Sequence, residues 1–213
     1  MSKVRVHIST SLDGYVAGPN QSMEEPLGAG GEGLHDWVVA LKAWREASGM
    51  EGGEENASTP VVLEEYANVG AEIMGRGKFG PPSRGPWGDD PWQGWWGDDP
   101  PFRKPVFVLT SHPREPLTLS DTTFTFVTDG IHAALDQARE AAGDRDVFIG
   151  GGAKTINQYL SAGLVDELEL HVVPILLGGG ARLFEGAGQQ VKLDLIRVAE
   201  APGVAHLKYR VRM

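Results

Sequence analysis

Residues 146–157, with the sequence DVFIGGGAKTIN, constrain the fold of this chain more than any other stretch. Val147–Ile149 is a short apolar run of residues that favour strands, and the three glycines Gly150–Gly152 follow it directly. The next residues have a helical pattern in which Ile156 and Tyr159 share one face. The sequence therefore predicts a buried strand that passes through a turn without side chains into the first turn of a helix.

This turn has two interpretations, and its own residues do not choose between them. The N-terminus of a helix presents unpaired backbone N–H groups and the positive end of the helix dipole, and a phosphate group is the natural ligand for both. In the other interpretation the glycines only provide the positive φ angles of a tight connection. Isolated glycine motifs of this kind match often by chance.

The acidic balance of the chain limits the ligands to be expected. With 19 Lys and Arg against 29 Asp and Glu, the formal net charge is −10. A general nucleic-acid binder needs a basic face, so we expect no nucleic-acid partner. An anionic cofactor would require a local cluster of basic residues against this background.

The chain contains no cysteine, which excludes disulfides, thiolate metal sites and a cysteine nucleophile. Such a composition suits a cytoplasmic protein. No apolar run approaches the ~20 residues of a membrane-spanning helix, and we expect no membrane partner. The N-terminus starts on a strand-like alternation, so no signal peptide is predicted. The length of 213 residues allows a sizeable core, and no metal site is predicted.

The first third of the chain alternates ordered segments with loops. Residues 4–9 alternate apolar and polar side chains like a strand, and Tyr15–Ala17 is a brief extended segment. The stretch 18–33 is rich in Gly, Pro, Asn and Ser, and it is long enough to act as a lid. His35–Ala47 has a helical apolar stripe, and Asp36 stands where an N-cap residue is expected.

A tryptophan-rich segment at residues 80–105 differs from the rest of the chain. It nearly repeats itself, as GPWGDDPW and then GWWGDDPP, and it holds four of the six tryptophans. One interpretation is a proline-rich loop whose rings pack on the surface. The other is an aromatic wall on a site or a subunit contact, because so many exposed rings would otherwise form a sticky patch. The sequence leaves both open.

The remaining residues alternate strand-like and helix-like patterns, and two antiparallel strands close the chain. This order predicts a mixed sheet with helices on both faces, in a single domain. Besides the helix after the glycine triplet, the expected helices are 61–69 and 131–142. The expected strands in this part are 106–110, 124–128, 164–173, 191–199 and 205–211.

Several motifs, taken in order, resemble one protein family. SLDGYVAG and MGRGKFG each follow a strand, FVLTS ends another, and VFIGGGAKTINQYL precedes PILLGGGARLFEG. Together they resemble the dihydrofolate reductase-like superfamily, and within it the branch of the C-terminal reductase domain of riboflavin biosynthesis proteins. The resemblance implies an α/β fold, namely a three-layer α/β/α arrangement with a central mixed, mostly parallel sheet of about eight strands. It also implies one domain over residues 1–213, with loop insertions near 18–33, 48–60 and 80–104.

The resemblance further implies NADPH as the cofactor and assigns roles to particular residues. Gly75 and Arg76 match the segment that holds the adenosine ribose phosphate, for which a guanidinium offers a bidentate fork of donors. The glycine triplet matches the pyrophosphate turn, and the end of the first strand matches the backbone that meets the nicotinamide carboxamide. The full implied set is Ile8, Ser9, Gly18, Gly75, Arg76, Lys78, Thr110, Ser111, Gly150, Gly151, Gly152, Ala153, Lys154 and Thr155.

Two residues are candidates on the substrate side. Asp36 falls near the acidic residue that contacts the pterin in dihydrofolate reductases, so it is a candidate for orienting or protonating a substrate, with the N-cap role as the alternative. His171 lies near a position that faces the substrate pocket in the family, and it is a candidate proton donor. The alternative for His171 is a partly buried structural histidine on an alternating strand.

The leading functional expectation is an oxidoreductase that transfers a hydride from NADPH to a C=N or C=O carbon. The substrate would be small and heterocyclic or sugar-like, in the manner of a pterin or a ribosylamino-pyrimidine. A second hypothesis is a non-catalytic NADP(H)-binding or sensing protein with the same fold, because few acid and base groups are available. In a third, no dinucleotide binds and the tryptophan-rich segment serves a partner protein. The family resemblance also implies a homodimer.

Overall fold

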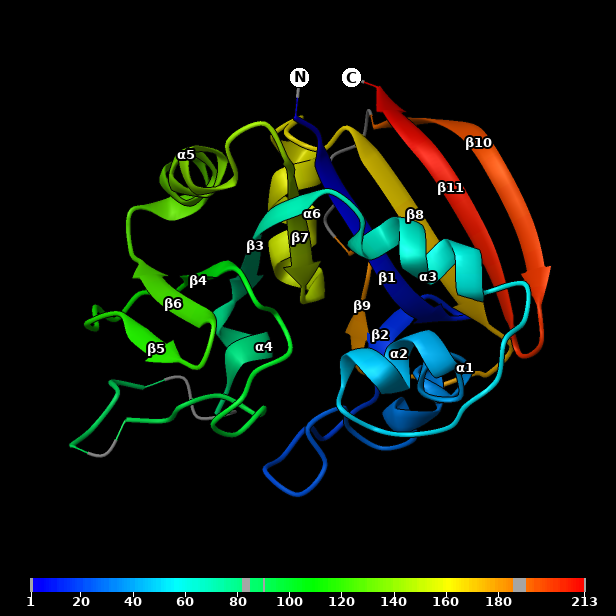
Figure 1. The fold of residues 1–213 in the computed structure, drawn as a ribbon, viewed down its shortest axis with the longest axis horizontal. Coiled ribbons are helices and arrows are strands. Elements are labelled where there is room, and N and C mark those ends of the chain that lie inside the picture. The colour runs from blue at the N-terminus through cyan, green and yellow to red at the C-terminus, as the bar shows by residue number, and fades with distance from the viewer. Residues whose placement is uncertain (1, 82–84, 90, 186–190, 213) are drawn as a thin grey trace.

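The computed structural model describes residues 2–81, 85–89, 91–185 and 191–212. Its main element is a nine-stranded sheet with the order β10-β11-β8-β1-β7-β3-β4-β6-β5, and a small second sheet pairs β2 with β9 (Figure 1). The strands are β1 Val4–Ser11, β2 Tyr15–Ala17, β3 Val69–Gly75, β4 Pro105–Leu109, β5 Leu117–Leu119, β6 Thr122–Val127, β7 Asp146–Gly151, β8 Glu167–Val173, β9 Ala181–Arg182, β10 Lys192–Ala201 and β11 Val204–Arg212. The helices are η1 Gly31–Leu34, α1 Asp36–Val39, α2 Lys42–Ala47, α3 Thr59–Tyr66, α4 Arg76–Phe79, α5 Gly130–Ala142 and α6 Ala153–Ser161.

The large sheet is mixed and mostly parallel. The pairs β8–β1, β1–β7, β7–β3, β3–β4 and β4–β6 are parallel. The pairs β10–β11, β11–β8 and β5–β6 at the two sides are antiparallel. Parallel strands bring their carboxyl ends to one edge, so the segments after β1, β3, β4 and β7 meet there. In Figure 1 this edge lies toward α4, away from the two chain termini.

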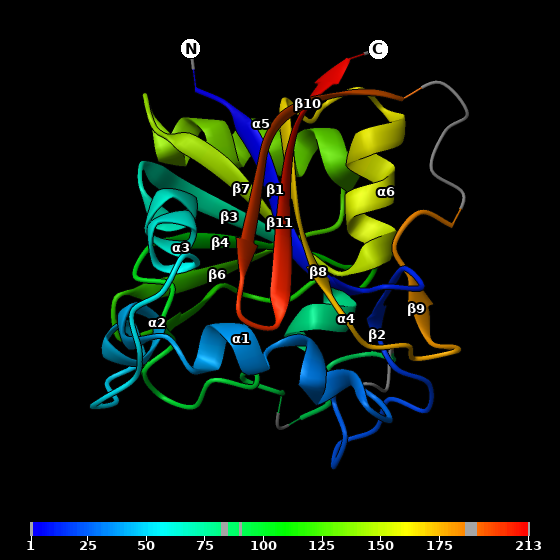
Figure 2. The same cartoon turned by 90° about the vertical axis from the view of Figure 1, so that its right-hand side faces the viewer.

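Helices cover both faces of the large sheet. On one face α5 packs on β3 and β4, and α6 packs on β7. On the other face lies α3, and Figure 2 shows α3 and α6 on opposite sides of β11. This arrangement confirms the predicted three-layer α/β/α fold. Within the described residues, no helix combines the length and the apolar character that crossing a membrane requires.

The main hydrophobic core lies between the sheet and the helices α5 and α6. Ile149 of β7, Leu135 of α5, and Ile156 and Tyr159 of α6 are all at most 1% exposed in this cluster. Burial of each such side chain stabilises the fold by roughly 1.5–3 kcal/mol. The Tyr159 hydroxyl donates a hydrogen bond to the carbonyl of Ile131 at 2.8 Å, which ties α6 to the start of α5. The predicted apolar face of the helix after the glycines is therefore confirmed.

The face of the sheet under α3 combines paired charges with a small apolar cluster. Glu64 of α3 forms ion pairs with Arg197 and Lys208. The apolar cluster contains Val62 of α3 together with Val173 of β8. This layer is therefore held both by ion pairs and by apolar packing.

Two local predictions in the first third of the chain are wrong. The expected helix 35–47 is two short helices, because Leu41 takes an extended conformation with φ −76° and ψ 136° between them. The amide of Lys42 donates to the carbonyl of Glu54 at 2.9 Å, so the segment after α2 folds back onto this break. Asp36 is not an N-cap: His35 is the N-cap residue of α1, and no side chain caps this helix.

The tryptophan-rich segment packs against a separate apolar cluster. The partly buried rings of Trp87, Trp92 and Trp96 contact this cluster, which contains Phe79 and Phe124. The indole N–H of Trp92 donates to the carbonyl of Phe79 at 2.8 Å, so the ring also satisfies its polar atom. Residues 82–84 and 90 of this segment lie outside the described residues. Surface packing accounts for most of its described part, but Trp87 contacts Arg76, as described below. The short strand β5 was not predicted.

Candidate cofactor site

The glycine turn lies at the edge where the parallel strands end. β7 ends at Gly151, which has a φ of +102° that side chains rarely allow. Gly152 follows with a φ of −73°, and a Cβ built there would meet no atom within 4 Å. The space in front of the turn is therefore open at Gly152, while Gly151 is a glycine for conformational reasons.

The first turn of α6 leaves backbone donors free for a ligand. The carbonyl of Gly152 accepts hydrogen bonds from the amides of Thr155 and Ile156, at 3.0 and 3.1 Å. The amides of Ala153 and Lys154 come before these and have no partner within the helix. Together with the helix dipole, they form a favourable position for an anion at the open side of the turn.

The turn after β3 lies directly beside the turn after β7. Met74 pairs with Gly151 across the two strands, and a Cβ built at Gly75 would lie 2.3 Å from Oγ1 of Thr155. A Cβ at Gly151 would be 3.7 Å from Cδ1 of Ile8 on β1. The structure thus brings together the glycine triplet, Gly75 and Ile8, three parts of the predicted set that are far apart in the sequence.

Two arginines, one of them directly after Gly75, lie against the same tryptophan ring. The guanidinium carbon of Arg76 lies 3.4 Å from the centre of a Trp87 ring, and that of Arg114 lies 4.9 Å from it. Arg76 donates to the carbonyl of Gly80, and its Nε is buried without a hydrogen-bond partner among the described residues. Burial and the charge of Arg114 lower the pKa of Arg76 to about 10, so both guanidiniums are charged at neutral pH.

This arginine pair calls for an anionic ligand. Burial lowers the pKa of both guanidiniums, and the charge of Arg114 lowers that of Arg76 further. No carboxylate of the described residues is among the causes that act on either pKa. The two like charges therefore destabilise each other. An anion between Arg76 and Arg114 would remove this repulsion and could satisfy Nε of Arg76.

Hydroxyl groups lie next to the arginine pair, at the end of β4. Thr110 Oγ1 accepts the amide hydrogen of His112 at 3.1 Å, and the carbonyl of His112 accepts the indole N–H of Trp87 at 2.9 Å. Ser111 lies between them and is exposed. The segment 110–112 is thereby linked through Trp87 to Arg76.

Other members of the predicted set lie elsewhere. The ammonium of Lys78 is 3.0 Å from Oε1 of Glu72, and a Cβ built at Gly150 would be 2.7 Å from it. Lys78 therefore lies beside Gly150, the first glycine of the turn, and its ion-pair partner among the described residues is Glu72. The amide of Gly18 donates to the carbonyl of Leu27 at 2.8 Å, within the loop at 18–33.

The two substrate-side candidates differ sharply in exposure. Asp36 is exposed at the start of α1, whereas His171 is 2% exposed. His171 Nδ1 lies 2.8 Å from Nδ1 of His206. Trp37 stands 4.8 Å from the His171 ring and donates its indole hydrogen to Ser9 Oγ at 3.1 Å. His171 and Ser9 thus belong to a buried network under α1 and α3.

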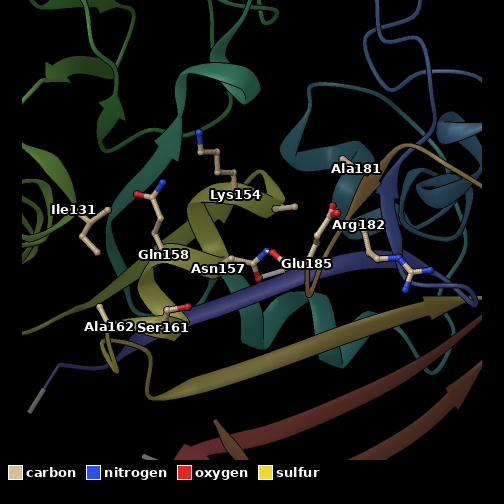
Figure 3. A pocket seen from close by; sticks show the side chains of 10 residues that line it. Ile131, Lys154, Asn157, Gln158, Ser161, Ala162, Ala181, Arg182 and Glu185 are labelled. Carbon is tan, nitrogen blue, oxygen red and sulfur yellow. The ribbon is translucent and has the colours of Figure 1, made fainter. Parts of the chain in front are cut away.

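An open hollow of about 700 Å³ runs along α6, whose first residues Ala153 and Lys154 line it. Figure 3 shows that Lys154 and Gln158 line it together with Arg182 and Glu185. Asn157 lies between them, and its amide donates to the carbonyl of Glu185 at 3.1 Å. The exposed Lys154 adds positive charge beside the free amides of the turn, which favours a negatively charged ligand.

Sequence reasoning missed several residues of these sites. The sequence motifs single out neither Arg114 nor Trp87 as a neighbour of Arg76, although Trp87 belongs to the tryptophan-rich segment. The neighbours of His171, which are His7, Glu65 and His206, carried no recognisable spacing. Their positions depend on how β1, α3 and β11 are arranged around β8, which no local pattern specifies.

Comparisons with known proteins identify the family. A model of the RibD C-terminal domain matches residues 2–207. The chain is 29% identical over 193 residues to uncharacterized protein YwjB of Bacillus subtilis (strain 168), which covers 91% of this chain and 88% of that protein. It is 30% identical over 90 residues to uncharacterized protein YyaP of the same organism, covering 42% of this chain and 47% of that protein.

Solved structures share the fold. A putative riboflavin biosynthesis protein from Shewanella sp. PV-4 has a TM-score of 0.61 and 23% identity, covering 99% of both chains. RibD from Acinetobacter baumannii has a TM-score of 0.58 and 19% identity, covering all of this chain and 59% of that one. The riboflavin biosynthesis reductase Rib7 of Saccharomyces cerevisiae has a TM-score of 0.53 and 16% identity, covering all of this chain and 89% of that one.

Proposed function

The chain belongs to the RibD C-terminal domain family, and from that membership we propose that it is an NADPH-dependent reductase. The hydride would pass to a C=N or C=O carbon of a small heterocyclic or sugar-like substrate, of the ribosylaminopyrimidine or pterin kind. The reductase named among the solved relatives supports this reaction class. The observation that carries the proposal is the presence of two positions that favour an anion, the glycine turn and the arginine pair. NADPH has two separate anionic groups to match them, the pyrophosphate and the 2′-phosphate.

The chain's own residues fit such a cofactor at both anionic groups. The pyrophosphate would accept hydrogen bonds from the amides of Ala153 and Lys154 at the open side of Gly152. The 2′-phosphate would lie between Arg76 and Arg114, where it satisfies the buried Nε of Arg76 and offsets the repulsion of the two charges. When bound, the nicotinamide supplies the hydride, and the protein supplies orientation and electrostatics.

Binding measurements on matched arginine variants test this assignment. A hydrogen bond to a charged group contributes roughly 1.5–3 kcal/mol, so Arg76→Ala and Arg114→Ala should each weaken NADPH binding about 10- to 150-fold. NADH lacks the 2′-phosphate and should lose less than about 3-fold by the same reasoning. Arg139→Ala, which removes an exposed arginine of α5, is the control. Isothermal titration calorimetry with both nucleotides gives the answer.

An equal loss of NADPH and NADH affinity, or no loss of either, would contradict the phosphate assignment of the arginine pair. In that case the pair would serve the packing of the tryptophan-rich segment, and cooperative urea unfolding of the same variants would show the destabilisation.

A second candidate function is a non-catalytic NADP(H)-binding or sensing protein. The observation in its favour is the position of His171, which is buried in a network and 2% exposed, so that the proton donor expected on this strand is shielded. The two functions separate in an assay of NADPH oxidation against pterins, quinones and ribosylamino-pyrimidines. Turnover of one of them favours the reductase, whereas tight NADPH binding without turnover on any of them favours the sensor.

We also propose that the chain forms a homodimer through the strand β10. Leu193, Leu195, Ile196 and Val198 of this edge strand are 39%, 57%, 47% and 60% exposed. Exposed apolar groups gathered on one strand commonly mark a contact with another chain. Leu195→Lys should convert a dimer into a monomer in size-exclusion chromatography with light scattering. A wild-type chain that elutes as a monomer would refute this proposal.

A further inference from the structure

Three side chains from three different elements meet under α3. Oε1 of Glu65 on α3 lies 2.6 Å from Nε2 of His171 on β8, and Oε2 of Glu65 lies 3.3 Å from Nδ1 of His7 on β1. The possible ligand atoms of the three residues all lie within 4.8 Å of one another. The side chains of Glu65, His171 and His7 are 4%, 3% and 12% exposed, so the cluster is shielded from bulk water.

The closest contact of this cluster joins Nε2 of His171 and Oε1 of Glu65, which lie 2.6 Å apart. Among the described residues, neither of these two buried atoms has a hydrogen-bond partner with regular donor and acceptor angles. A buried polar atom without a partner costs roughly 1–3 kcal/mol. Imidazole and carboxylate lone pairs that converge in this way are explained if a cation lies among them.

We infer that His7, Glu65 and His171 bind a divalent first-row transition metal ion, with zinc as the best-fitting member. Two imidazoles and one carboxylate form the ligand set of catalytic zinc sites and of mononuclear iron sites. Two ligand atoms roughly 2.0–2.2 Å from a tetrahedral ion lie about 3.3 Å apart. The contact between His7 and Glu65 already has this length. The contact between His171 and Glu65, at 2.6 Å, would widen by about 0.7 Å on binding.

A second layer of contacts holds His171 in a ligand orientation. Its Nδ1 lies 2.8 Å from Nδ1 of His206, and Nε2 of His206 lies 2.9 Å from Oγ of Ser58. If His206 donates to Ser58, its Nδ1 accepts the Nδ1–H of His171, and Nε2 of His171 keeps its lone pair for the ion. Metal-binding histidines generally use their other ring nitrogen in this way.

The surroundings also suit a dication. The ring of His7 is stacked on Phe148 with a centroid distance of 3.9 Å, which fixes its direction. The nearby cations are already neutralised, because Lys78 lies 3.0 Å from Glu72 and Arg5 lies 3.5 Å from Asp146. The negative charge of Glu65 therefore stays available for the ion. Three protein ligands leave one coordination position open for water.

Metal titration of the full chain tests this inference without a nucleotide or a substrate, and so independently of the proposed reductase function. The chain is stripped with a chelator and titrated with ZnCl₂, with CoCl₂ and, under anaerobic conditions, with an iron(II) salt. We expect one equivalent to bind per chain, an absorption spectrum of tetrahedral or five-coordinate cobalt, and a rise of the melting temperature that grows with free metal concentration.

Variants locate the ion. His171→Gln and Glu65→Gln should each weaken binding by about 100-fold or more, and His206→Gln by about 10- to 100-fold. His132→Gln, which replaces an exposed histidine of α5, should bind like the wild type. Cooperative melting of each variant shows that it is folded.

Two results would overturn the inference. The first is a folded wild-type chain that binds no equivalent of zinc, cobalt or iron(II), which would leave the cluster as a buried polar network. The second is a folded His171→Gln variant that binds metal as tightly as His132→Gln, which would place the ion elsewhere. Because the wild-type titration decides first, a variant that fails to fold does not obscure the answer.

Discussion

Adding one methyl group at Gly75 should disrupt the contact between the two turns of the cofactor site. Gly75 has φ −84° and ψ 156°, an extended conformation that alanine adopts without strain. The new Cβ, however, would lie 2.3 Å from Oγ1 of Thr155. A carbon and an oxygen in contact are about 3.3 Å apart, so the overlap is about 1 Å. The cost of Gly75→Ala is thus steric, and overpacking of this kind costs about 1–3 kcal/mol.

A double-mutant cycle separates this clash from other effects. Thr155→Ala removes the Oγ1 atom that the new methyl group would meet, so the double variant should regain most of the stability that Gly75→Ala loses. The coupling energy should reach about 1–3 kcal/mol in the stabilising direction, the size of the overpacking cost. Urea unfolding of the wild type, both single variants and the double variant provides the four free energies.

The same four proteins report on the cofactor. NADPH affinity should fall in Gly75→Ala and recover in part in the double variant, because the two turns would regain their spacing. If Gly75→Ala is as stable as the wild type, or if the two substitutions act additively, then β3 and α6 do not pack as described and the proposed joint site is wrong.

Three further predictions concern the same region and the loop after β1. Gly152→Ala should leave the melting temperature unchanged but weaken NADPH binding, because its Cβ would enter the open side of the turn. Gly179→Ala is the control, since a Cβ there would also meet open space. Unchanged NADPH affinity in Gly152→Ala would mean that the pyrophosphate binds elsewhere. Trp87→Ala should weaken NADPH binding and lower stability, because it removes ring contacts with Phe79 and Phe126 as well as the contact with Arg76. The Arg76 contact accounts for about 0.5–2 kcal/mol of the loss, and urea unfolding with calorimetry would detect both effects. A hydrogen bond from the Ser11 hydroxyl, and then bonds from backbone amides, lower the pKa of Asp13 from 3.8 to about 2. The folded state therefore favours the ionised form, and this stabilisation is present above pH 3.8 and is lost as the pH falls through about 2. Asp13→Asn should lower the melting temperature much more at pH 7 than at pH 2.

The fold class and the positions of most elements follow from local patterns. The helix after the glycine triplet could be predicted because its apolar stripe has the helical period, and Ile156 and Tyr159 are indeed buried. The late strands could be predicted because their side chains alternate. The prediction of one helix over residues 35–47 is wrong because Leu41 is extended and interrupts the helix. Leu41 forms a bridge with Glu54, thirteen positions later, and the apolar stripe carries no information on this pairing.

The site is less predictable than the fold. Motifs brought Gly75, Arg76 and the glycine triplet to attention because each stands at the end of a strand in a recognisable sequence. Arg114 has no such motif, and its place near Arg76 depends on Trp87, whose ring lies against both guanidiniums. His7, Glu65 and His171 meet through strand order and through the placement of α3 over the sheet. Neither can be obtained from the spacing of these residues along the chain.

A crystal structure with NADP⁺ bound tests the central claim most directly. The account predicts the pyrophosphate at the amides of Ala153 and Lys154, in front of Gly152, and the 2′-phosphate between the guanidiniums of Arg76 and Arg114. A pyrophosphate bound away from the turn, or a 2′-phosphate that neither arginine contacts, would contradict it.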